Sequence, residues 1–237
     1  MSVPELIVAL DVPDFDGAKR VFDALDNLPV TYKVGLEAFC AYGDEIRSEL
    51  ERRHAGYFLD LKLHDIPRTV AAAIRPLVRP GARIINVHAL GGSAMMQAAV
   101  ETAEERAAEL GIDPPEIFAV TILTSIAPED LRELGLSGGP GENAIRLAAL
   151  ARDARCAGVI CSPQEVRDLK SFFGTEFKTI TPGIRPSGAP HGDQKRLMTP
   201  ADAREAGSDY IVVGRPILDA PDMRAAAQDV LSELLPA

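Results

Sequence analysis

Two carboxylates and an ammonium group are concentrated in the segment Asp60-Leu61-Lys62-Leu63-His64-Asp65. The segment follows an apolar run that predicts a strand over residues 57–61, and side chains two positions apart on a strand share a face. Asp60 and Lys62 are therefore expected on one side, with Leu61 and Leu63 packed on the other. Nearby opposite charge keeps such a lysine protonated, so Lys62 could act as a general acid. A lone Asp-x-Lys pair is more often a salt bridge at a strand end, and the surrounding residues must decide between the two.

The chain alternates short apolar or β-branched runs with longer amphipathic stretches, which predicts strands alternating with helices. The predicted strands span residues 6–10, 32–34, 57–61, 84–87, 117–121, 158–161, 178–181 and 210–213. The predicted helices span residues 16–28, 43–54, 69–78, 95–110, 142–154, 199–206 and 223–235. Eight such units predict an α/β fold, a (β/α)8 TIM barrel that occupies residues 1–237 as a single domain. A doubly wound open sheet is the alternative, but it requires a glycine-rich dinucleotide motif after the first strand, and Asp11-Val12-Pro13-Asp14 is not one.

Polar residues lie at the ends of nearly all the predicted strands, where a TIM barrel builds its active site. A histidine such as His88 is more often a satisfied core residue than a catalyst, and each of the others could be structural. Lys33 and Lys62 stand out because a solvated surface lysine is not expected at an apolar strand end. In strand order the residues are Asp11, Lys33, Asp60 with Lys62, His88, Thr121 with Thr124, Pro182 with Gly183 and Arg185, and Gly214 with Arg215. Their convergence at one barrel mouth favours an active site.

The last two strands are followed by features suited to a phosphate group. Val213-Gly214-Arg215-Pro216 combines a glycine that lets backbone approach a ligand, an arginine for bidentate contact and a proline suited to a first helical turn. The preceding loop, residues 182–198, is long, rich in glycine and proline, and contains Arg185, Gln194 and Lys195. Long loops of this kind are commonly functional, so we expect a lid that closes over a phosphorylated ligand and brings Gln194 above it.

Composition narrows the classes of partner. The net charge of −10 disfavours nucleic acid, which needs a basic face on the protein. No apolar run approaches the roughly 18 residues of a membrane span, and the first residues lack the basic region of a signal peptide, so we expect a soluble, cytoplasmic protein without membrane contact. The cysteines Cys40, Cys156 and Cys161 have no metal-binding spacing, and we expect them in or near the core. No metal site is predicted.

Three stretches of the chain carry a family resemblance. They are Asp60-Leu61-Lys62-Leu63-His64-Asp65-Ile66-Pro67-Arg68-Thr69, then residues 181–186 with 192–194 and 199–200, and finally residues 213–217. The first is similar to a D-x-K-x-x-D-I-P-x-T signature, and the second to a phosphate-gripping loop. With supporting matches at residues 9–11, 33–35 and 120–125, the chain resembles the orotidine 5′-phosphate decarboxylase family, in its bacterial form, over nearly its whole length.

The resemblance implies decarboxylation of orotidine 5′-phosphate to uridine monophosphate (UMP) in pyrimidine synthesis, without a cofactor or metal. Lys62 would protonate C6 of the pyrimidine after carbon dioxide leaves. Asp60 would lie against the substrate carboxylate, Lys33 would hold Asp60 and the ribose, and Asp11 would bind a ribose hydroxyl.

The resemblance further implies a homodimer in which Asp65 and Thr69 reach into the active site of the other subunit. Thr124 would contact the base, and Gln194 could touch both the base and the phosphate. The remaining implied substrate-binding residues are Pro182, Arg185, Gly214 and Arg215, the last three on the phosphate.

Other functions remain as alternatives at this point. A magnesium-dependent 3-keto-gulonate 6-phosphate decarboxylase shares the Asp-x-Lys-x-x-Asp pattern, but it should carry an acidic metal ligand where this chain has Lys33, whose charge would repel the cation. A Schiff-base aldolase needs a deprotonated lysine, which flanking carboxylates oppose. A non-catalytic nucleotide-binding barrel would need neither Asp60 nor Lys62.

Overall fold

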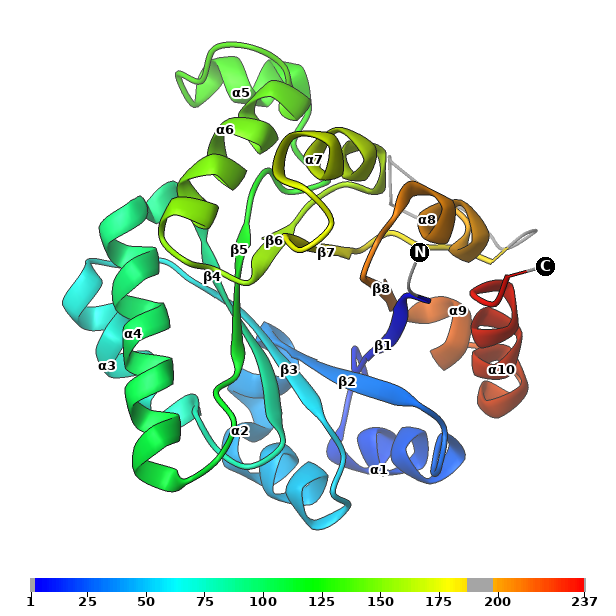
Figure 1. Cartoon of the computed structure of the whole chain (residues 1–237). Coiled ribbons are helices and arrows are strands. Elements are labelled where there is room, and N and C mark those ends of the chain that lie inside the picture. Colours follow the sequence, from blue (N-terminus) through cyan, green and yellow to red (C-terminus); the bar gives the residue numbers. More distant parts are fainter. Residues whose placement is uncertain (1–2, 187–197, 237) are drawn as a thin grey trace.

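Parallel strands close into a barrel in the computed structural model, which describes residues 3–186 and 198–236 (Figure 1). Each strand pairs with the next along the chain, and β8 pairs with β1. The strands are β1 (Glu5–Ala9), β2 (Val30–Gly35), β3 (Tyr57–Leu63), β4 (Ala82–His88), β5 (Glu116–Val120), β6 (Gly158–Ile160), β7 (Lys178–Thr181) and β8 (Tyr210–Val213). The predicted TIM barrel is confirmed, and each predicted strand overlaps an observed one.

Helices surround the barrel as an outer ring (Figure 1). They are α1 (Phe15–Ala24), α2 (Leu36–Arg52), α3 (Pro67–Leu77), α4 (Ser93–Leu110), α5 (Pro128–Glu133), α6 (Pro140–Asp153), α7 (Val166–Phe173), α8 (Pro200–Ala206), α9 (Arg215–Leu218) and α10 (Met223–Glu233), with 3-10 turns η1 (Ala89–Gly91) and η2 (Pro163–Glu165). The sequence did not predict α5 or α7, and it anticipated α9 only through Pro216 as a residue suited to a first helical turn. It also placed the start of α2 at Gly43, which is wrong: the helix begins at Leu36 and is kinked at Gly43, whose φ is +39°.

Two apolar layers result from the alternation of side chains along the strands. On β1, Ile7 and Ala9 belong to a small cluster inside the barrel with Phe58 and Phe118. The neighbouring Leu6, Val8 and Leu10 pack outward in the larger layer between strands and helices. The filled interior makes the barrel a rigid support, so that only the ends of its strands are open for binding.

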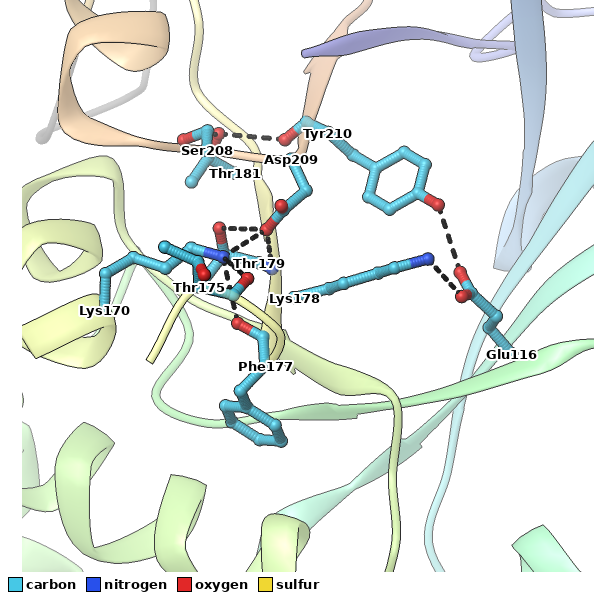
Figure 2. Close-up of polar contacts among 10 residues, drawn as sticks. All are labelled: Glu116, Lys170, Thr175, Phe177, Lys178, Thr179, Thr181, Ser208, Asp209 and Tyr210. Atoms are coloured by element: carbon cyan, nitrogen blue, oxygen red, sulfur yellow. Dashed lines mark hydrogen bonds and ion pairs between the residues drawn. The ribbon is translucent and has the colours of Figure 1, made fainter. Parts of the chain in front are cut away.

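The amino ends of the strands are joined by polar contacts (Figure 2). Glu116 of β5 accepts hydrogen bonds from Lys178 of β7 and from the Tyr210 hydroxyl of β8. Asp209 accepts from the Lys170 ammonium at 2.7 Å and from the backbone N–H of Thr179 at 2.7 Å. These contacts link β5, β7 and β8 at the end of the barrel opposite the predicted site.

Two further sequence expectations concern the environment of apolar segments and cysteines. No helix within residues 3–186 and 198–236 is long and apolar enough to cross a membrane. Cys156 and Cys161 are buried as expected, and burial raises the pKa of the Cys156 thiol to about 12. Cys40 is exposed, so the expectation that it lies near the core is wrong.

Candidate active site

Carboxylates and ammonium groups from three neighbouring strands alternate in a row at the barrel mouth. Lys33 on β2 lies with its Nζ 3.5 Å from Asp11 Oδ1 and 3.3 Å from Asp60 Oδ2. Lys62 Nζ donates to the other oxygen, Asp60 Oδ1, at 2.7 Å. The structure therefore brings Asp11 and Lys33, which follow or lie on the first two strands, together with Asp60 and Lys62 of the third.

The carboxylate of Asp60 lies between the two lysines of this row of charged side chains. Its side chain is only 13% exposed, and burial acts to raise its pKa. Attraction by Lys33 and Lys62, with hydrogen bonds from Lys62 and Asn86, outweighs burial and holds the pKa of Asp60 below its ordinary value. Asp60 is therefore ionised at neutral pH and sits between two cations.

The backbone at Lys62 differs from the regular strand on which the sequence argument relied. Its φ is +50°, in the left-handed region that residues other than glycine rarely adopt. The pairing of β3 with β4 also shifts, because Leu59 faces Ile85 while Leu63 faces Val87. The predicted contact between Asp60 and Lys62 is present, but it is made across a bulge rather than by strand alternation.

Asn86 of β4 is a site residue that the sequence analysis missed. It is fully buried, and its Nδ2 donates to Asp60 Oδ1 at 2.7 Å. Its Oδ1 accepts from the backbone N–H of Lys62, also at 2.7 Å. The available signal was an amide within the apolar run Ile84-Ile85-Asn86-Val87, since a buried polar group requires partners.

Gly35, at the end of β2, lies close to the Lys33 ammonium. A Cβ at Gly35 would lie 3.0 Å from Lys33 Nζ and 3.6 Å from Asp11 Oδ1. The glycine at the end of β2 thus leaves room for the ammonium between its two carboxylates. The sequence analysis had noted Gly35 only as part of a motif.

A cavity of about 260 Å³ opens beside these charges. One part of its wall is charged, with Lys33, Asp60 and Lys62, and the rest is largely apolar. Its other lining residues are Phe58, Val120, Ile122, Leu123, Thr124, Ser125, Ile160, Cys161, Ile180, Pro182 and Val212. Thr124 and Pro182 thus share one cavity with the charged residues, and a flat ring could lie against the apolar wall.

The predicted phosphate residues lie after β7 and β8. A Cβ at Gly214 would lie 3.6 Å from Asp11 Oδ2, so this turn lies next to the row of charged side chains. Arg215 is exposed at the start of α9. Arg185 is half-buried, and its backbone N–H donates to the carbonyl of Met198 at 3.0 Å. Gln194 and most of the predicted lid lie outside the described residues.

Asp65 and Thr69 are exposed and do not line the cavity of their own chain. Asp65 precedes α3 and accepts a hydrogen bond from the Ile66 N–H at 2.6 Å, while Thr69 lies in the first turn of that helix. The sequence expectation that both side chains face outward is confirmed.

His88, at the end of β4, stacks on His64 with ring centroids 5.4 Å apart. Burial, followed by repulsion from His64 and Lys62, lowers the pKa of His88 to about 4. The imidazole is therefore neutral at neutral pH, and its Nδ1 accepts from the Leu90 N–H at 3.3 Å. This is the behaviour of a structural histidine.

The site has donors and charge suited to stabilising an anion next to Lys62. Within residues 3–186 and 198–236, no group of three or more His, Cys, Asp or Glu side chains could hold a metal ion. The closed barrel, with its charged cavity at the carboxyl ends of the strands, is that of a TIM-barrel enzyme.

Comparison with known proteins specifies the family. The model of the Orotidine 5′-phosphate decarboxylase / HUMPS family matches residues 4–230, and the chain belongs to this family. The chain is 47% identical to an orotidine 5′-phosphate decarboxylase of Moorella thermoacetica, over 97% of this chain and 92% of the relative. It is 45% identical to one of Saccharophagus degradans, over 98% and 95%. The crystal structure of orotidine 5′-phosphate decarboxylase from Lactobacillus acidophilus matches with a TM-score of 0.88 and 37% identity, over 98% of this chain and all of that one.

Proposed function

We propose that the chain decarboxylates orotidine 5′-phosphate to UMP as a step of pyrimidine synthesis. The observation that carries the proposal is the Lys33–Asp60–Lys62 arrangement on a cavity with an otherwise largely apolar wall. Family membership supports the choice of substrate.

Lys62 supplies the proton in the proposed reaction. The bond between C6 and the carboxylate breaks, carbon dioxide leaves, and the electron pair stays on C6. The ammonium of Lys62 stabilises this charge and then donates a proton to C6, after which the neutral amine regains a proton from water. Asp60 accepts a hydrogen bond from the Lys62 ammonium at 2.7 Å and lies where it would repel the substrate carboxylate.

The other site residues bind and orient the substrate in this proposal. Lys33 and Asp11 bind ribose hydroxyl groups, and Lys33 also holds Asp60 in place. Thr124 contacts the base and Pro182 borders it. Arg185, Gln194, Gly214 and Arg215 bind the phosphate, and binding energy from this remote group helps to hold the ring against Lys62.

The position of Lys33 supports a metal-independent reaction. Its ammonium lies between Asp11 and Asp60 at 3.5 and 3.3 Å, the place that a divalent cation would take between two carboxylates. A second cation there would be repelled by the first.

We further propose that the enzyme is a homodimer with shared sites, in which Asp65 and Thr69 act in the cavity of the partner. Apolar side chains at the same mouth support an interface, because Leu36, Ile66 and Leu90 follow the adjacent strands β2, β3 and β4 and are 53%, 62% and 42% exposed. A patch formed by these three side chains would favour protein contacts.

The reaction is tested with purified, EDTA-treated protein and orotidine 5′-phosphate, by following the loss of orotate absorbance and the formation of UMP. We expect full activity after EDTA treatment. Activity that requires added magnesium would contradict the metal-independent mechanism, and binding without turnover would favour a non-catalytic barrel.

The shared site is tested by mixing two inactive variants, Lys62→Ala and Asp65→Ala. In a heterodimer, one cavity lacks both residues and the other has both, so activity should return on mixing. If sedimentation shows an active monomer, or if subunits exchange without recovery of activity, Asp65 does not act across an interface.

A further inference from the structure

One buried amide connects the two residues at the centre of the site. Asn86 Nδ2 donates to Asp60 Oδ1, and Asn86 Oδ1 accepts from the backbone N–H of Lys62, each at 2.7 Å. The orientation of the amide is set by these partners, because a carboxylate needs a donor and an N–H needs an acceptor. Asn86 therefore contacts the carboxylate of Asp60 and the backbone of Lys62 at the same time.

The bulge in β3 explains why Lys62 needs such a partner. Residues 60–62 lie between the pairs Leu59–Ile85 and Leu63–Val87, so three residues of β3 face one residue of β4. The Lys62 N–H receives its acceptor from the Asn86 side chain, and its φ of +50° is rare for a lysine. A conformation of this kind persists where the surrounding contacts hold it.

We infer that Asn86 is a positioning residue, which holds the backbone of Lys62 in the conformation that directs its ammonium to the cavity and holds Asp60 beside it. The effect of Asn86 on turnover rests on the proposed function, whereas its effect on the conformation of Lys62 rests on geometry alone. Asn86 does not line the cavity, so it acts through Lys62 and Asp60.

The charges around Asn86 allow a sharp test. Asp60 and Lys62 of β3 contact it directly, and Lys33 of β2 lies on the far oxygen of Asp60. From β5 the strand pairing places apolar Phe118 opposite Asn86. On β4 itself, His88 is neutral at neutral pH, and His64 stacks on it.

The variant Asn86→Asp preserves the shape of the side chain and makes its donor depend on pH. The introduced carboxyl keeps an oxygen for the Lys62 N–H, but it donates to Asp60 only while it is protonated. Burial and the charge of Asp60 raise the pKa of this carboxyl, whereas Asp60 stays ionised between its two lysines. The ratio of variant to wild-type kcat should therefore fall by roughly 100-fold between about pH 5 and about pH 9, the usual cost of misplacing a catalytic group by about 1 Å.

The matched control is Asn143→Asp. Asn143 on α6 is also buried and donates to the carbonyls of Ser137 and Gly139, at 2.9 and 3.0 Å. This variant loses stability through the same chemical change, but its kcat ratio should be independent of pH. UMP affinity should change little in either variant, because the proposed phosphate and ribose contacts are intact.

A second variant tests the geometry without reference to the reaction. In a crystal structure of Asn86→Leu, we expect a negative φ at Lys62 and an Nζ to Asp60 distance beyond about 4 Å, the limit of a salt bridge. A flat kcat ratio for Asn86→Asp, or an unchanged Lys62 in Asn86→Leu, would overturn the inference. Wild-type protein inactive on orotidine 5′-phosphate would overturn the proposed function instead, and the crystal structure would still decide the role of Asn86.

Discussion

Lysines contact carboxylates at both ends of the barrel, but their surroundings differ. At the amino ends of the strands, the Lys170 ammonium donates to Asp209 and to the carbonyls of Thr175 and Phe177 (Figure 2). Its three protons thus have three acceptors. At the mouth, Asp60 is the acceptor recorded for Lys62 within the described residues, and Lys62 lines the cavity. Lys62 therefore retains donor capacity for a ligand.

Cavity size does not distinguish the two ends. The larger cavity, about 760 Å³, lies at the amino ends and includes Glu116, Lys178 and Tyr210 in its wall. Those groups are bonded to one another, so a ligand there would have to compete with existing contacts. At the smaller cavity, at the mouth, Asp60 lies between two lysines at unequal distances, 3.3 Å from Lys33 and 2.7 Å from Lys62. Lysines whose protons all have acceptors therefore stabilise the fold, whereas a lysine with spare donors is available for binding and chemistry.

The largest expected effect is at the mouth, with Lys62→Ala. We expect kcat to fall by at least about 10⁴-fold, because the variant loses both the proton donor and the charge that stabilises C6. UMP binding should change far less, since the phosphate contacts remain. The measurement is steady-state turnover with UMP titration, and Lys178→Met at the opposite end is the control. Near-normal turnover in Lys62→Ala would remove Lys62 from the mechanism.

The variant Arg215→Ala should weaken phosphorylated ligands by about 2 to 4 kcal/mol, the usual cost of losing a charge-assisted contact. Binding is measured by calorimetry with UMP, and uridine without phosphate is the matched control ligand. An equal loss for both ligands would show that Arg215 does not bind the phosphate.

At the amino ends, Lys170→Met should lower the free energy of unfolding by about 2 to 3 kcal/mol, because the partly buried Asp209 loses its cation. The methionine retains the apolar stem. Denaturant unfolding measures the loss, and kcat measured on the folded fraction should be unchanged. A large fall in kcat with unchanged stability would show that Lys170 serves the reaction and not the stability of the fold.

The smallest effect is expected for Lys178→Met, at about 0.5 to 1 kcal/mol, since this pair is more exposed and screened by solvent. Burial acts to lower the pKa of Lys178, but the hydrogen bond and attraction from Glu116 outweigh it and raise the pKa above its ordinary 10.5. A raised pKa in the folded state gives stability that is complete below the unfolded value and lost as pH rises through the folded value. The stability difference from wild type should therefore disappear at high alkaline pH. Unfolding curves at several pH values measure this difference. A difference that persists at high pH would contradict the role of the charge.

Local sequence patterns determined the order of elements and the identity of the central charges. Apolar runs spaced by amphipathic stretches predicted every strand, because alternation along a strand is written into neighbouring residues. The same argument paired Asp60 with Lys62, two positions apart, although the structure makes their contact across a bulge. The helices α5 and α9 are too short to show a clear helical period and depend on packing against the barrel. Length does not explain why α7 was missed, because it is longer than the predicted α8.

Only the tertiary structure decided how the central lysine is held. The sequence predicted a regular strand at Lys62, whereas the structure has a bulge with a left-handed residue. The group that satisfies that backbone, Asn86, lies on another strand, and its partners are set by strand register rather than by any local pattern. The spacing of Asp11, Lys33 and Asp60 was equally a matter of barrel closure, since it joins side chains from three strands. The residue types that do the chemistry could therefore be named from the sequence, while their geometry depends on contacts between residues far apart in the chain.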